Sequence, residues 1–191
     1  MLTIDSETPT RLARLGSAAE PLAAGYSLLH WLGATPAEYV DQVVALHAVM
    51  ADAPRNDGME PWAWTADRLL QSEQTMLEHR LMIYTVAARH DTTGQLAALT
   101  EVCMEADSPD WAFQQITAVR PEHRGHRLGL LTKSAMLDLL AKLEPGVSRV
   151  QTGNAGMNAH MIAINEQLGF TIAGVGRDWE LDLACVPAIQ S

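Results

Sequence analysis

The sequence has 191 residues, of which 48% are hydrophobic and 19% are charged, a composition typical of a folded protein rather than a disordered one. Its net charge of −10, from 13 Lys and Arg against 23 Asp and Glu, argues against non-specific binding to nucleic acid or to anionic membranes. The same charge favours a cationic or amine-bearing partner over an anionic one.

Cysteine and histidine usage gives no sign of a metal site. Cys103 and Cys185 lie far apart, so we expect each to be a buried apolar residue in a reducing compartment. The histidines are scattered, without HxH or HExxH spacing. Charged residues interrupt the N-terminus, and no uncharged apolar run is long enough to span a bilayer, so we expect a cytoplasmic protein without a membrane partner.

The first third of the chain predicts one strand and two helices. Residues 1–20 have no clear hydrophobic period and predict an extension or a loosely docked arm before a single domain at 21–191. A strand is predicted at 25–32, followed by a helix that Pro36 opens and a second helix that Pro61 opens.

The rest of the chain alternates further strands and helices, which predicts a mixed α/β layer structure. In chain order, we expect strands at 81–89, 95–104 and 111–119, a helix that buries Leu130, Leu137 and Leu140 and ends at Pro145-Gly146, a strand at 149–152, a helix that ends at Gly169, and a strand at 177–183.

The segment at 119–130, Val-Arg-Pro-Glu-His-Arg-Gly-His-Arg-Leu-Gly-Leu, connects a predicted strand to a predicted helix. Such a loop directs several backbone N–H groups and a helix N-terminus at one point, which favours a phosphate or pyrophosphate. Arg124, His126 and Arg127 would add charge-assisted contacts. By itself, the pattern fits a basic turn without a ligand equally well.

A second motif begins at Asn158 and ends in Leu-Gly-Phe at 168–170. With the order Val-x-Pro-x-x-Arg-Gly-x-x-x-Gly at 119–129, it resembles the acetyl-CoA site of the GNAT N-acetyltransferase superfamily. The resemblance runs from about residue 25 to 183 and looks like a branch common in actinobacteria. It implies an α/β (α+β) fold: a mixed, mostly antiparallel sheet, splayed at the acetyl-CoA site, with helices on both faces.

The resemblance also assigns positions along acetyl-CoA. The strand before the loop would offer its backbone to the pantetheine arm, the loop amides would hold the pyrophosphate, and two asparagines would reach the arm. For Asn158, capping of the following helix is equally open. The cofactor-binding residues implied are Thr117, Ala118, Val119, Arg124, Gly125, His126, Arg127, Leu128, Gly129, Leu130, Asn154 and Asn158.

Two residues depart from the family pattern. Asn165 stands where many members have a tyrosine that protonates the departing CoA thiolate, and asparagine cannot donate a proton and recover it. A thiol pKa of about 8.5 lets water protonate the thiolate, so both acyl transfer and binding without turnover stay open. Arg127 replaces a usual glycine, and we expect its φ to be negative.

Attack by an amine needs a group that takes its proton. Glu101 is the first candidate because it lies in the middle of an apolar predicted strand; the alternative is that it points to solvent. Asp52 comes next, because the loop after the first helix lines the acceptor site in relatives. His123 is expected on phosphate or in solvent, and Trp64 is a candidate wall of the acceptor site.

These features predict an N-acetyltransferase that moves acetyl from acetyl-CoA to a primary amine, in a small-molecule acceptor, by direct attack in a ternary complex. We expect no metal, and a monomer or a homodimer. The alternatives are a non-catalytic acyl-CoA sensor, a protein N-acetyltransferase, and an enzyme for a different acyl donor.

Overall fold

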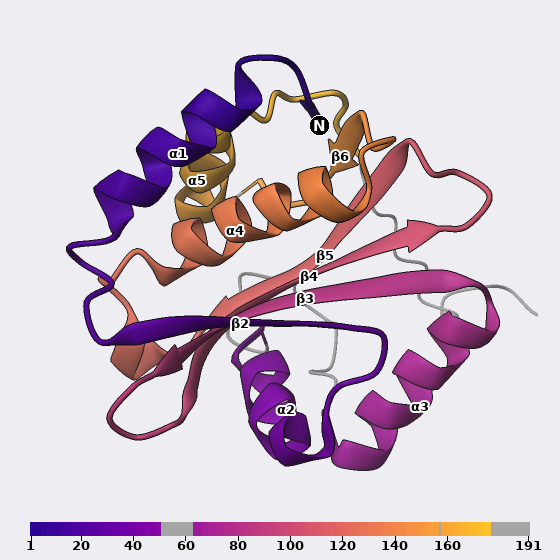
Figure 1. Cartoon of the computed structure of the whole chain (residues 1–191). Coiled ribbons are helices and arrows are strands. Elements are labelled where there is room, and N and C mark those ends of the chain that lie inside the picture. Colours follow the sequence, from indigo (N-terminus) through magenta and orange to yellow (C-terminus); the bar gives the residue numbers. More distant parts are fainter. Residues whose placement is uncertain (51–62, 157, 177–191) are drawn as a thin grey trace, which may run out of the picture.

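The computed structural model describes residues 1–50, 63–156 and 158–176, which form a six-stranded sheet with helices on both faces (Figure 1). The strands are β1 (Leu2–Thr3), β2 (Tyr26–Leu32), β3 (Leu81–His90), β4 (Leu96–Glu105), β5 (Trp111–Val119) and β6 (Arg149–Gln151). The helices are α1 (Thr8–Ala19), α2 (Val40–Val49), α3 (Ala66–Glu78), α4 (Leu128–Leu143) and α5 (Ala159–Leu168), with short 3-10 helices at Ala37–Tyr39 and Pro121–His123.

The sheet order is β1-β6-β5-β4-β3-β2, and its neighbours are antiparallel except for β5 and β6. The parallel pair joins only Trp111–Phe113 to Arg149–Gln151. Beyond Phe113, the edge of β5 that faces β6 has no strand partner among the described residues. The expected mixed, mostly antiparallel sheet that splays at one place is thus confirmed.

Helices cover both faces of the sheet, as expected. On one face, α4 packs over β3, β4 and β5, and α1 and α5 pack against α4, in a core that includes Leu12, Val102 and Leu137. On the other face, α2 and α3 pack in a second core that includes Leu46 and Leu99 (Figure 1). This double cover explains why every residue of β4 except its last is buried.

The N-terminal segment is not the loosely docked arm that its composition suggests. Leu2 in β1 is 1% exposed and pairs with Val150 of β6, and Leu12 in α1 belongs to the same core as α4. The prediction failed because α1 presents only a narrow apolar stripe among Thr, Ser and Ala residues.

The other predicted elements agree with the structure to within a few residues, with one marked difference. The helix expected to open at Pro61 begins at Ala66, because the Thr65 side chain accepts a hydrogen bond from the Arg68 N–H and caps it. Pro61 and the strand expected at 177–183 lie outside the described residues. In the part of the chain that the structure describes, no helix is long and apolar enough to cross a membrane.

Candidate functional site

A cavity of about 680 Å³ opens where β5 separates from β6. Its walls come from β5, the loop after β5, the first turns of α4, the segment after β6, and α5. Every predicted cofactor residue lines it except His126, whose ring hydrogen bonds to the Leu22 carbonyl at 2.9 Å. Two motifs far apart in the sequence thus meet at one site.

The loop between β5 and α4 offers backbone donors to this cavity. Leu128, Gly129 and Leu130 form the first turn of α4, so their N–H groups have no partner within the helix, and all three residues line the cavity. Gly125 has φ +89°, a conformation that favours glycine. The loop therefore has the donors and the helix N-terminus that bind an anion.

Arg127 adopts a left-handed conformation, with φ +55°, at the N-cap of α4. The expectation of a negative φ was wrong. The chain must turn sharply between Gly125 and the helix, and the backbone makes this turn at the position where the family pattern usually has glycine.

Contacts of His123 with Tyr26 and Gln95 support the loop. The Tyr26 hydroxyl and His123 Nδ1 are 2.8 Å apart, and His123 Nε2 lies 3.3 Å from Gln95 Oε1. Burial lowers the pKa of His123, which favours its neutral form. His123 thus links the loop to β2 and to the β3–β4 turn, although it also lines the cavity.

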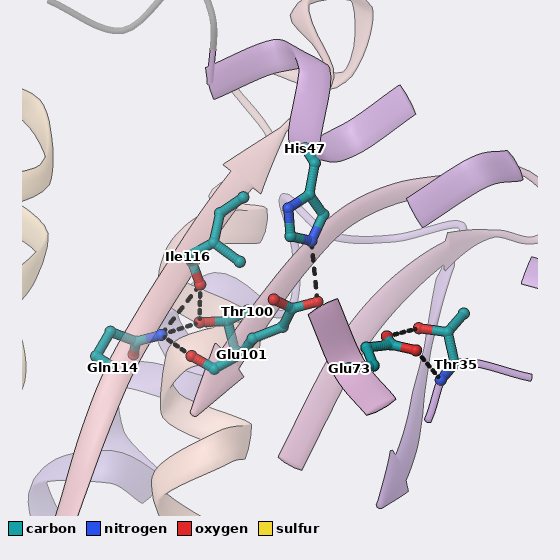
Figure 2. A network of polar contacts seen from close by, with 7 residues as sticks. All are labelled: Thr35, His47, Glu73, Thr100, Glu101, Gln114 and Ile116. Carbon is teal, nitrogen blue, oxygen red and sulfur yellow. Dashed lines mark hydrogen bonds and ion pairs between the residues drawn. The ribbon is translucent and has the colours of Figure 1, made fainter. Parts of the chain in front are cut away.

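A β-bulge interrupts β5 beside Gln114 and Gln115, which line the cavity. Thr100 pairs with Thr117, but Val102 pairs with Gln114, so β5 holds one extra residue there. The Gln114 side-chain amide donates to the Glu101 carbonyl at 2.6 Å, to the Thr100 hydroxyl at 2.9 Å and to the Ile116 carbonyl at 3.1 Å (Figure 2).

Glu101 lies on the α2 side of the sheet, where its carboxylate is 3.1 Å from His47 Nε2 (Figure 2). Glu101 is 8% exposed and His47 is 7% exposed, so the alternative that Glu101 points to solvent is wrong. The Trp64 ring packs on His47 with ring centres 4.4 Å apart.

Neither Glu101 nor His47 is among the described residues that line the cavity, but both adjoin residues that are. Gln114 contacts Glu101, and Val49 follows His47 at the end of α2. Asp52 lies outside the described residues. The pairing of His47 with Glu101 was not predicted, because residues 54 positions apart give no local signal of contact.

The two asparagines of the second motif have different settings. Asn158 caps α5 by accepting a hydrogen bond from the Met161 N–H at 3.2 Å, and it also lines the cavity. Asn165 is 5% exposed and does not line the cavity as described. Its Oδ1 is buried and has no hydrogen-bond partner within the described ranges.

Lys133 is a lining residue that sequence reasoning missed. Its side chain is 2% exposed, and Nζ donates to Gln114 Oε1 at 2.9 Å. Burial lowers its pKa to about 7. A signal was present, because Lys133 falls on the helical stripe of buried residues that includes Leu130 and Leu137.

Cysteine and metal chemistry have no support at this site. Cys103 is buried, as expected, and burial raises the pKa of its thiol. Cys185 lies outside the described residues. Among the residues described, no group of three or more His, Cys, Asp or Glu side chains is arranged to hold a metal ion.

Neither protein-family models nor curated proteins give a match to this sequence. Solved structures do. The chain is 36% identical to the tandem GNAT protein from the clavulanic acid biosynthesis pathway, with a TM-score of 0.64 over 76% of this chain. It spans 42% of the length of that protein.

Two more distant structures have the same fold. The spermidine/spermine N-acetyltransferase of Vibrio cholerae is 16% identical over 80% of this chain and 82% of its own, with a TM-score of 0.55. The ribosomal-protein-S18-alanine N-acetyltransferase of Escherichia coli is 19% identical over 82% and 86%, with a TM-score of 0.53. The fold is that of GNAT acetyltransferases, and the similarities support a place in the GNAT superfamily.

Proposed function

From the GNAT fold and the geometry of its open cavity, we propose that this chain is an N-acetyltransferase that uses acetyl-CoA. One observation carries the proposal: the unpaired edge of β5 and the free N–H groups of the α4 N-terminus line the same cavity. An unpaired strand edge suits the amides of a pantetheine arm, and a helix N-terminus suits a pyrophosphate.

We assign the pyrophosphate to the loop and to the first turn of α4. The N–H groups of Gly125 and of residues 128–130 would donate to its oxygens, and Arg124 and Arg127 would add charge-assisted bonds. Both arginines line the cavity. The pantetheine arm would lie along 117–119, with Asn154 and Asn158 on its other side.

The reaction needs a base for the amine and donors for the developing oxyanion. The proposed base is Glu101, paired with His47, because this pair is buried and its neighbours line the cavity: Gln114 contacts the Glu101 backbone, and Val49 lies two residues after His47. A backbone N–H of residues 117–119 would stabilise the oxyanion. Acetyl-CoA supplies the activated acyl group.

The proposed acceptor is the primary amine of a small molecule, and the charge of −10 favours a cationic one. Two structural neighbours differ in acceptor class: one is named as acting on spermidine and spermine and the other on a ribosomal protein. Protein acetylation therefore stays the alternative acceptor class, and mass shifts on lysate proteins would identify it.

The test is release of free CoA thiol from acetyl-CoA in the presence of a panel of amines, including polyamines, aminoglycosides and amino-acid derivatives. We expect one class to stimulate thiol release at least tenfold over the hydrolysis seen without an amine.

Asn165 favours a second candidate function, a non-catalytic acyl-CoA sensor, because asparagine cannot supply the acid that the tyrosine of the family pattern supplies. Tight acetyl-CoA binding with no turnover on small molecules or lysate proteins would support the sensor and contradict the enzyme.

A further inference from the structure

Lys133 lies on α4 about one turn after Leu128, Gly129 and Leu130, the first-turn residues that line the cavity. Its Nζ donates to Gln114 Oε1 at 2.9 Å and lies 5.3 Å from the centre of the Phe170 ring. An ammonium has three N–H donors, and within the described residues this one has a single hydrogen-bonded partner, which is neutral. The protein thus compensates this buried charge only in part.

No carboxylate of the described residues neutralises Lys133. The ionisable residues that line the described cavity are all basic: His123, Arg124, Arg127, Lys133 and His160. Glu101 contacts the same Gln114 amide, but only through its backbone carbonyl, because its carboxylate faces His47. An ammonium buried without an anion is costly, and an anion brought by a ligand would restore its charged form.

The depth of Lys133 along β5 indicates which part of an acyl-CoA lies beside it. The first turn of α4 lies at the Val119 end of β5, since a Cβ added to Gly129 would be 3.6 Å from Val119 Cγ2. Lys133 Nζ donates to the Gln114 side-chain amide, whose Nε2 lies 3.1 Å from the Ile116 carbonyl. The contact therefore lies near Ile116, about 10 Å further along the strand at about 3.3 Å per residue. A pantetheine arm of about a dozen bonds of about 1.5 Å is long enough to bring its sulfur to this position.

We propose that Lys133 stabilises the thiolate of CoA as it leaves, in place of the tyrosine that the family pattern has at Asn165. The inference rests on the proposed function. The acceptor nitrogen forms a bond to the acetyl carbon as the carbon–sulfur bond breaks, and the electron pair stays on sulfur. The thiolate then accepts a charge-assisted hydrogen bond from Lys133 Nζ. The surplus proton of the acceptor passes to the Glu101–His47 pair and then to solvent, and CoA leaves as a thiol after taking a solvent proton.

The test measures the thiol pKa of bound CoA from the ultraviolet absorbance of the thiolate, which requires no known acceptor. Calorimetry of CoA binding accompanies it. In the wild type, we expect the bound thiol to deprotonate about one pH unit or more below free CoA, and Lys133→Met to remove this shift while CoA still binds. Lys133→Arg should retain part of the shift, because it keeps the charge. Lys142→Met removes an exposed lysine of the same helix and should leave the shift intact.

Two results would overturn the role of Lys133 and leave the proposed function standing. One is a wild-type bound thiol that deprotonates at or above the pH of free CoA, which requires no variant. The other is an unchanged pKa of the bound thiol in a Lys133→Met variant that still binds CoA, because the shift would then not come from Lys133. Absence of CoA binding to the wild type would overturn the proposed function itself.

Discussion

Single residues of this cavity are held against their intrinsic preferences, and Arg127 is one of them. Its φ of +55° places an L-residue in the left-handed region, which costs roughly 1–2 kcal/mol relative to glycine. Glycine in turn loses more conformational entropy on folding, by roughly 0.5–1 kcal/mol. The net cost of placing arginine here instead of glycine is therefore small, and Arg127 lines the proposed phosphate site.

Arg127→Gly should therefore raise the free energy of unfolding by up to about 1 kcal/mol and weaken CoA binding by up to about tenfold, since one charge-assisted contact is lost. Urea unfolding and calorimetry measure the two effects. Arg80→Gly is the control, because Arg80 also has a positive φ, of +61°, does not line the cavity, and makes an ion pair with Asp107 that is largely exposed to solvent. It should give a similar gain in stability with unchanged CoA affinity. Equal CoA affinity in both variants would contradict the assignment of Arg127 to the phosphates.

Lys133 also predicts a specific dependence of stability on pH. Burial lowers its pKa from 10.5 to about 7, so between these pH values the unfolded chain holds a proton that the folded chain has lost. The contribution of this residue to the free energy of unfolding is therefore lowest below pH 7 and rises as the pH approaches 10.5, by a total on the order of 5 kcal/mol.

The variant Lys133→Met isolates this term. The free energy of unfolding of Lys133→Met should exceed that of the wild type by the largest amount at pH 6, and this difference should disappear by pH 10. Urea unfolding at several pH values measures it. Lys142→Met removes an exposed ammonium and serves as the control. A difference between Lys133→Met and wild type that stays constant over this range would mean that the Lys133 amine titrates normally.

At the scale of elements, the central arrangement is the approach of α2 to β4, which brings His47 to the carboxylate of Glu101. A second link, between α3 and the turn after β2, runs from Glu73 to the N–H of Thr35 at 3.0 Å and to its hydroxyl at 2.6 Å (Figure 2). Both links are buried, and they fix the helices that cover this face of the sheet.

If Glu101 accepts the proton of the acceptor, Glu101→Gln should lower turnover by two orders of magnitude or more near neutral pH. The loss should shrink at high pH, where the amine is already deprotonated. Rates of thiol release from pH 6 to 10 test this with the acceptor found in the panel. Glu73→Gln changes a buried carboxylate on the same face that does not contact His47, and should leave turnover nearly unchanged. An equal rate in Glu101→Gln and wild type at every pH would exclude Glu101 as the base.

Element boundaries also show what the sequence can predict. The strands β2 and β5 and the helices α4 and α5 were predictable, because apolar periodicity, capping asparagine and terminal glycine are all local signals. The docking of α1 was not predictable because it depends on tertiary contacts, and the late start of α3 at Ala66 was not because it depends on competition between caps. The left-handed Arg127 and the buried Lys133 equally depend on how α4 meets β5.

At the scale of the whole molecule, the cavity opens because β5 and β6 pair over only a few residues and then separate, while helices cover both faces of the sheet. The motif at 119–130 and the motif at 158–170 were assigned to one site by resemblance, and the structure brings them together around that opening. The assignment of their residues to CoA atoms stays a prediction, as do the actinobacterial branch, the oligomeric state and the acceptor.

The most direct test of the account is CoA binding by calorimetry, comparing wild type with Gly125→Asp. The variant places a carboxylate against the proposed pyrophosphate position, and Gly33→Asp is the control, because Gly33 has a similar positive φ, of +77°, and does not line the cavity. We predict that the wild type and Gly33→Asp bind CoA and acetyl-CoA, and that Gly125→Asp has an affinity for both at least a hundredfold lower. Undiminished affinity in Gly125→Asp, or no CoA binding by the wild type, would contradict the assignment of this cavity to acetyl-CoA.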